Sequence, residues 1–271
     1  MNHDVIGVLD SGVGGLTVVK EVKRQLPKET IYYFGDTLRC PYGPRSREEV
    51  EMFIHEIVSF LMQYPLKALL IACNTGTAAA LTSVKRRLDI PVLGVIEPGV
   101  RAAIKVSRQR KIAVIGTQGT IRSQAYEQLL KSIHPEMHVY SLACPAFVPI
   151  VEKGLYRSAE AERIVKQTLA PLKEKEIDTL ILGCTHYPLL QHFIAKTMGE
   201  GVKIISSAEE TAAELSSILY HQQLLSEDYG SNDRFFTTGS RLVFHQVAEE
   251  WLGEKVSVEQ VELTALKNLA T

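Results

Sequence analysis

Two cysteines of this chain each follow an aliphatic segment and precede small polar residues. Cys73 begins the stretch CNTGT after LLIA, and Cys184 lies in GCTHYP after LIL, two residues before His186. A thiol has an ordinary pKa of about 8.5, so it can hold or release a proton near neutrality. Two thiols on opposite sides of one carbon atom could remove a proton from one face and deliver another to the opposite face. The residues therefore permit a two-base proton transfer.

The same cysteines permit other chemistry. The chain has four widely spaced cysteines, Cys40, Cys73, Cys144 and Cys184, and we expect free thiols rather than a disulfide. No CxxC pair is present, and CxH alone has no recognised zinc spacing, so we expect no metal site. A single cysteine nucleophile with His186 as its base stays open. So does a structural role, in which both cysteines are small buried side chains.

Short aliphatic segments recur along the chain and are predicted to be strands buried on both faces. Helical spacing fills the stretches between them, for example 46–63, where Glu56 lies off the apolar stripe. Strands that alternate with helices predict an α/β fold with parallel sheets, whose ligands bind beyond the carboxyl ends of the strands. The predicted strands are 5–10, 30–36, 68–73, 92–96, 111–117, 179–184, 202–206 and, near the C-terminus, parts of 234–239 and 257–263.

Three pairs of segments repeat in the same order at a nearly constant offset, which indicates two copies of one α/β unit. We expect two similar parallel-sheet lobes related by pseudo-two-fold symmetry, with the active site in the cleft between them. The first lobe would comprise residues 1–97 and 208–271, and the second 98–207. Cys73 and Cys184 would then lie on opposite walls. The pairs are IGVLDSGVGG (6–15) with IAVIGTQGT (112–120), RCPYG (39–43) with ACPAF (143–147), and LLIACNT (69–75) with LILGCTH (180–186).

Composition argues against several classes of protein. Thirty Lys and Arg against 31 Asp and Glu give a net charge of -1, so nucleic-acid binding is not expected as the main task. The N-terminus lacks the pattern of an export signal. The most apolar stretch, 68–84, is interrupted by polar residues before it reaches the roughly 20 apolar residues of a membrane span. We expect a cytoplasmic protein that binds neither nucleic acid nor membrane.

The glycine-rich segment DSGVGGLT follows a predicted strand, as a nucleotide-binding loop would. The third glycine of the dinucleotide fingerprint would fall at Thr17, however, and the lysine of a P-loop is absent. We therefore do not expect a nucleotide cofactor.

Along nearly its whole length, the chain resembles the cofactor-independent glutamate racemases. The paired CNT and GCTHYP signatures are typical of the broader aspartate/glutamate racemase group, and DSGVGG with CPYG narrows the resemblance to the glutamate enzymes. At position 76 the family pattern leads us to expect alanine, but this chain has glycine. The resemblance rests on GVLDSGVGGLTV (7–18), YFGDTLRCPYGPRS (33–46), IACNTGTA (71–78), GVIEPG (94–99), ACPAFVPIVEKG (143–154) and LILGCTHYPLL (180–190).

The resemblance implies that Cys73 and Cys184 are the two acid/base thiols and that glutamate is the substrate, with no cofactor and no metal. Asp10 would assist Cys73, and His186 with Glu152 would assist Cys184. It also implies a role in supplying D-glutamate for peptidoglycan, and it leaves a homodimer open. The substrate-binding residues that it implies are Asp10, Ser11, Tyr42, Gly43, Asn74, Thr75, Thr117, Thr120, Thr185 and His186.

Alternatives remain at this point. Asp10 could instead cap the helix that follows, and Glu152 could be an ordinary surface acid. The chain could racemise aspartate or a related acid, or bind a dicarboxylate on the same scaffold without catalysis. A racemase that uses pyridoxal phosphate would need a Schiff-base lysine, and no lysine here stands in a recognisable setting.

Overall fold

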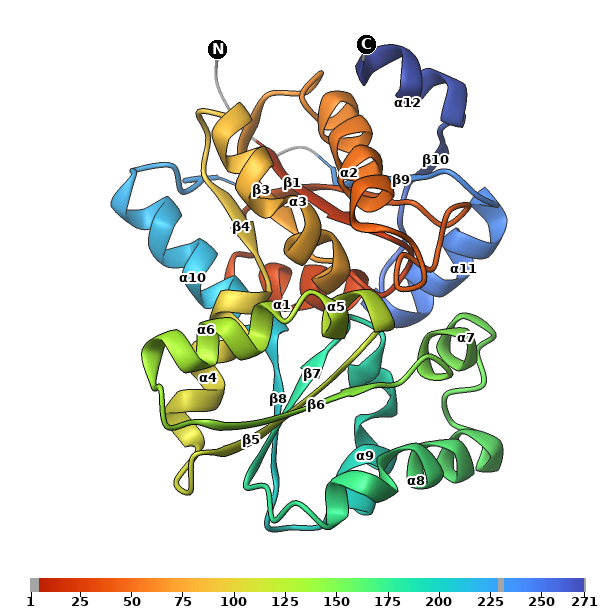
Figure 1. Cartoon of the computed structure of the whole chain (residues 1–271). Helices are drawn as coiled ribbons and strands as arrows, with labels where there is room; N and C mark the ends of the chain where they lie inside the picture. Colours follow the sequence, from red (N-terminus) through yellow and green to blue (C-terminus); the bar gives the residue numbers. More distant parts are fainter. Residues whose placement is uncertain (1–4, 229–231, 271) are drawn as a thin grey trace.

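The computed structural model describes residues 5–228 and 232–270. They form two parallel sheets, each covered by helices on both faces (Figure 1). The strand order is β10-β9-β2-β1-β3-β4 in the first sheet and β6-β5-β7-β8 in the second. The predicted α/β class and its two lobes are confirmed.

The two sheets share one topology. In each, the first strand of the repeat lies between the second and the third, so β2-β1-β3-β4 corresponds to β6-β5-β7-β8, as expected for two copies of one unit. The first sheet contains β1 (Val5–Asp10), β2 (Thr30–Gly35), β3 (Leu66–Ile71), β4 (Val92–Gly94), β9 (Arg234–Thr237) and β10 (Val258–Gln260). The second contains β5 (Lys111–Gly116), β6 (His138–Ala143), β7 (Thr179–Gly183) and β8 (Lys203–Ser206).

Each aliphatic segment predicted to be a strand forms one, with small shifts at the ends. Strand β6 was not predicted. It forms one edge of the second sheet, and its residues are half-buried or exposed, so its sequence, HVYSLA, lacks a continuous aliphatic run.

Side chains alternate between the two faces of the first sheet, as strand geometry requires. Ile6 and Val8 of β1 pack on one side, and Val5 and Leu9 on the other. The first side is covered by α1 (Leu16–Gln25), α10 (Ser207–His221) and α11 (Arg241–Leu252). The second is covered by α2 (Arg47–Leu61), α3 (Asn74–Arg87) and α12 (Leu263–Ala270).

Helices cover the second sheet in the same way. The core on one face includes α7 (Phe147–Glu152), α8 (Ala159–Lys173), the short helix η1 (Tyr187–Leu190) and α9 (Gln191–Met198). The other face packs against α4 (Ile96–Val106) and α6 (Ala125–Ile133). The one-turn helix α5 (Gln118–Arg122) follows β5 and lies where the two lobes meet (Figure 1).

An acidic residue off the apolar stripe of its helix is expected to be exposed to solvent, but Glu56 is not. It is buried, and it pairs with Arg39, which also donates to Asp36 over 2.6 Å. A buried carboxylate needs such a partner, because removal from water disfavours its charge. The loop after β2 supplies the partner, and this contact could not be read from helical spacing.

The predicted lobe boundaries fall beside the starts of α4 and α10. This division of the chain stays a prediction. Among the described residues, no helix combines the length and the apolar character needed to cross a membrane.

Candidate active site

The two cysteines occupy corresponding places in the two lobes. Cys73 follows β3, and Cys184 follows β7, the strand in the same position of the second sheet. Both are buried, and both line one small cavity. Both lobes contribute to its wall. The lining residues are Ser11, Pro41, Tyr42, Gly43, Cys73, Asn74 and Thr75 from the first lobe, and Thr117, Val148, Cys184, Thr185 and His186 from the second.

Cys73 lies at the N-terminus of α3. Its sulfur accepts a hydrogen bond from the backbone N–H of Gly76 over 3.3 Å. Burial, reinforced by the charge of Asp10, raises the pKa of Cys73 to about 12. The thiol therefore holds its proton at neutral pH and can act as an acid.

Asp10 ends β1 and is fully buried behind the cavity. One carboxylate oxygen accepts from the N–H of Gly12 over 3.0 Å, and the other from the hydroxyl of Thr185 over 3.1 Å. It does not cap α1, whose N-cap residue is Gly15. Burial raises the pKa of Asp10. The carboxyl group thus joins the first lobe to the loop that carries Cys184.

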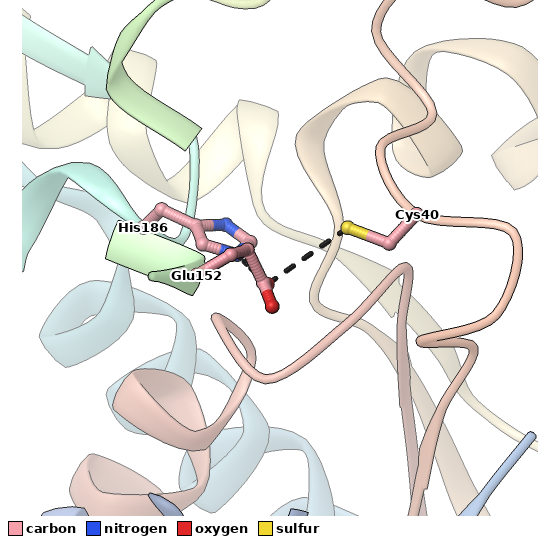
Figure 2. A group of neighbouring side chains, drawn as sticks. All are labelled: Cys40, Glu152 and His186. Carbon is pink, nitrogen blue, oxygen red and sulfur yellow. Dashed lines mark hydrogen bonds and ion pairs between the residues drawn. The ribbon is translucent and has the colours of Figure 1, made fainter. Parts of the chain in front are cut away.

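His186 connects Cys184 with Glu152. Its Nδ1 lies 3.7 Å from the Cys184 sulfur. On the other side of the ring, Nε2 lies 2.6 Å from Oε1 of Glu152 (Figure 2). Burial alone would lower the pKa of His186, but the contacts with Cys184 and Glu152 raise it well above its ordinary value. Burial would likewise raise the pKa of Glu152, and the bond from His186 lowers it instead. The two side chains form an ion pair at neutral pH, so Glu152 is not an isolated surface acid.

Cys40 lies on the other side of Glu152. Its sulfur is 3.8 Å from Oε1 of Glu152 (Figure 2). Burial, followed by the charge of Glu152, raises the pKa of Cys40. Cys40 was not among the site residues expected from the sequence, although the repeat of RCPYG as ACPAF marked the segment that carries it.

Three threonine hydroxyls meet at the boundary between the lobes. Thr75 Oγ1 is 2.8 Å from Thr117 Oγ1 and 3.1 Å from Thr120 Oγ1, and the latter two are 3.2 Å apart. Thr75 and Thr117 line the cavity, whereas Thr120 lies behind them. Its predicted contact with the substrate stays a prediction.

Asn74 opens α3, and its amide oxygen accepts from the hydroxyl of Tyr126 over 2.6 Å. Tyr126 is buried and belongs to α6 of the second lobe. This tyrosine was not expected at the site from the sequence. With the oxygen bound in this way, the NH₂ group of Asn74 is left as a donor.

Tyr42 and Gly43 contribute differently to the wall of the cavity. The Tyr42 hydroxyl donates to Asp36, so it is occupied within the first lobe. Gly43 touches the second lobe, and a Cβ placed there would lie 2.6 Å from Cβ of Thr117. Only a residue without a side chain allows this approach.

The glycine-rich loop after β1 has a similar packing role. A Cβ on Gly14 would lie 2.5 Å from Nδ1 of His186, and a Cβ on Gly12 would lie 2.9 Å from Oε1 of Glu152. These glycines let the first lobe reach the loop of His186. The absence of side chains here is thus explained without a bound phosphate.

Known proteins resemble this chain in sequence and in overall structure. Residues 6–215 match the family described as Asp/Glu/Hydantoin racemase. The chain is 55% identical over 260 residues to a glutamate racemase of Listeria monocytogenes serotype 4a (strain HCC23), covering 95% of this chain and 98% of that protein. A crystal structure of a glutamate racemase isoform from Bacillus anthracis superposes with a TM-score of 0.94 at 57% identity, covering 97% and 99% of the two chains. The glutamate racemase from Francisella tularensis, solved in complex with D-glutamate, gives 0.90 at 37% identity, covering 97% and 99%. The chain belongs to the Asp/Glu/Hydantoin racemase family.

Proposed function

We propose that this protein interconverts L-glutamate and D-glutamate by moving the α-proton between Cys73 and Cys184. One observation carries the proposal. The two cysteines follow corresponding strands of two similar lobes, and both line the same cavity. The glutamate racemases to which the chain is similar, one of them solved with D-glutamate, support glutamate as the substrate.

The reaction begins with one cysteine as a thiolate and the other as a thiol. Beside the His186 imidazolium, the Cys184 thiolate removes the α-proton and becomes a thiol. Cys73 then gives its proton to the opposite face of the carbon and becomes a thiolate. The reverse reaction exchanges the two roles, and no proton is gained or lost overall.

Proton transfer between positioned groups supplies roughly 100-fold to 10,000-fold, which is too little for an acid as weak as an amino-acid α-carbon. The charge that develops on the substrate carboxylate must also be stabilised. Asn74, Thr75 and Thr185 are the donors proposed for this task, assisted by the N-terminus of α3. Exclusion of water from the buried cavity strengthens these interactions.

Asp10 acts on the Cys73 side in this proposal, and the pair His186 and Glu152 on the Cys184 side. The remaining proposed substrate contacts come from Ser11, Tyr42, Gly43, Thr117 and Thr120. Residues 1–97 with 208–271 would form one lobe and 98–207 the other. Free thiols suit a reducing cytoplasm, where D-glutamate would be supplied for peptidoglycan.

Circular dichroism of L-glutamate incubated with the purified protein tests this function. The wild type is expected to abolish the signal without added pyridoxal phosphate, whereas Cys73→Ala and Cys184→Ala leave it unchanged. Cys144→Ala is the matched control, because Cys144 is buried outside the cavity. Racemisation by either active-site variant at the wild-type rate would refute the two-thiol mechanism. Faster turnover of aspartate would reassign the substrate.

A further inference from the structure

Cys40, Glu152 and His186 bring a sulfur, a carboxylate oxygen and a ring nitrogen together, all within 4.8 Å of one another (Figure 2). Each comes from a different segment, after β2, at the end of α7 and after β7. These are the three kinds of atom that Zn²⁺ prefers, and three protein ligands leave a fourth position for water. We propose that Zn²⁺ binds this trio and thereby inhibits the enzyme. The inhibition rests on the proposed function, whereas the binding does not.

The distances are close to those of a tetrahedral zinc site. Zinc bonds of about 2.3 Å to sulfur and about 2.0 to 2.2 Å to oxygen and nitrogen place neighbouring ligand atoms roughly 3.5 Å apart. The Cys40 sulfur is 3.8 Å from Oε1 of Glu152, so this edge needs little change. Nε2 of His186 is 2.6 Å from the same oxygen. That edge must widen by roughly 1 Å, which the exchange of a hydrogen bond for two metal bonds achieves by side-chain rotation.

Gly12 leaves room for the ion. A Cβ on Gly12 would lie 2.9 Å from Oε1 of Glu152 and 3.1 Å from the Cys40 sulfur, so any side chain there would fill the space between these two ligands. Solvent reaches the site from the Glu152 side, because the Glu152 side chain is 30% exposed. The His186 side chain, at 2% exposed, is the buried end of the site. An ion can therefore enter beside Glu152 without passing through the substrate cavity.

Binding would change what His186 can do. On coordination, the Cys40 thiol loses its proton and the imidazolium loses the proton on Nε2, so two protons leave as the ion binds. His186 then shares no proton with Glu152, and Cys184 faces the Nδ1 atom of a neutral, ion-bound imidazole in place of an imidazolium. The expected result is slower racemisation without a block of the substrate cavity.

Calorimetric titration of the EDTA-treated full chain with ZnCl₂, together with Co²⁺ absorption spectra, tests the site directly. We expect one ion per chain and a near-ultraviolet charge-transfer band from the cobalt–thiolate bond. In Cys40→Ser, the affinity for Zn²⁺ should fall at least tenfold and the band should vanish. Cys144→Ser is the matched control, because Cys144 occupies the corresponding position of the second repeat and should leave both signals intact.

An activity assay then distinguishes zinc binding at Cys40 from zinc binding at Cys73 and Cys184. Zn²⁺ should inhibit the wild type and Cys144→Ser, and EDTA should restore both, whereas Cys40→Ser should keep its basal activity and resist the ion. Wild-type affinity in Cys40→Ser would overturn the proposal and point to Cys73 and Cys184 as the ligands. Absence of binding to the wild type at about 0.1 mM ZnCl₂, which would occupy most of a site with a Kd in the micromolar range, would overturn it too. The binding data need no turnover, so they hold or fail independently of the racemase assay.

Discussion

The hydroxyl of Tyr126, in the second lobe, donates to the amide oxygen of Asn74, in the first, over 2.6 Å. This bond crosses the boundary between the lobes and fixes which end of the amide carries the free donor. Asn74 can then offer N–H groups to a carboxylate when the lobes are together. We therefore expect Tyr126 to be a positioning residue that acts through Asn74.

Replacement of Tyr126 by phenylalanine should leave the buried amide oxygen without its partner, at a cost of about 1 to 3 kcal/mol. We expect roughly a tenfold loss in kcat/KM for glutamate, measured by circular dichroism. Tyr140→Phe is the control, since Tyr140 lies on the half-buried edge strand β6. A double variant with Asn74→Ala should lose little more than Asn74→Ala alone. Additive losses would contradict action through Asn74.

Glu152→Gln should lower the pKa of His186, because it removes the carboxylate that holds the imidazolium. We expect the alkaline limb of the pH–rate profile that reports this imidazolium to move to lower pH. His192→Gln, in the exposed start of α9, serves as the control. An unchanged profile in Glu152→Gln would contradict the role given to the pair.

The same ion pair predicts how stability depends on pH. The raised pKa of His186 contributes fully below the unfolded value of about 6.5 and is lost as pH rises through the folded value. The lowered pKa of Glu152 contributes fully above about 4.5 and is lost as pH falls. Urea unfolding should therefore show the largest difference between the wild type and Glu152→Gln at about pH 4.5 to 6.5. A constant difference from pH 4 to 9 would rule this out.

Gly14→Ala should force apart Gly14 and the loop of Thr185 and His186, because the new Cβ would overlap both side chains. Overpacking of this kind costs about 1 to 3 kcal/mol, and we expect at least a tenfold loss of activity as His186 shifts. Gly201→Ala is the control, since a Cβ at that position would have no atom within 4 Å. Wild-type kinetics for Gly14→Ala would show that this approach is not needed.

Gly76→Ala tests the one position where the chain departs from the resemblance. Gly76 lies in the first turn of α3, and alanine there gains up to about 1 kcal/mol of helix propensity. The new Cβ would lie 2.9 Å from the terminal carbon of Ile54, which can rotate away. We expect a small rise in the thermal unfolding midpoint and unchanged activity. A marked fall in stability would mean that Ile54 cannot move.

The buried strands, and the positions of Cys73 and Cys184 after two of them, could be predicted because local sequence determines both. Aliphatic runs specify strands buried on both faces, and the polar residues after them mark the carboxyl edge of a parallel sheet. Strand β6 could not be predicted in this way. It lies at the edge of its sheet with mixed burial, so it has no continuous aliphatic run. The repeat contained the missing signal, since ACPAF begins at the last residue of β6 and its counterpart RCPYG lies in the loop after β2.

Contacts between the lobes could not be predicted in the same way. Tyr126 is 52 residues from Asn74, and Cys40 is 112 residues from Glu152, so no spacing rule connects them. Thr120 does not line the cavity but contacts Thr75, which does, and its predicted contact with the substrate stays a prediction. Such details depend on how closely two lobes approach.

The duplication gives matching thiols but unequal surroundings. In the aligned repeats, Asp10 corresponds to Gly116, and His186 to Thr75. L-glutamate and D-glutamate would therefore meet different supporting groups, and kcat and KM are free to differ between the two directions. The ratio kcat/KM, however, must be the same in the two directions. L-glutamate and D-glutamate have equal free energy in water, and both react through the same highest transition state. Asymmetry between the half-sites can thus favour tighter binding of one enantiomer only with a matching loss of turnover, and it can never make the reaction run one way.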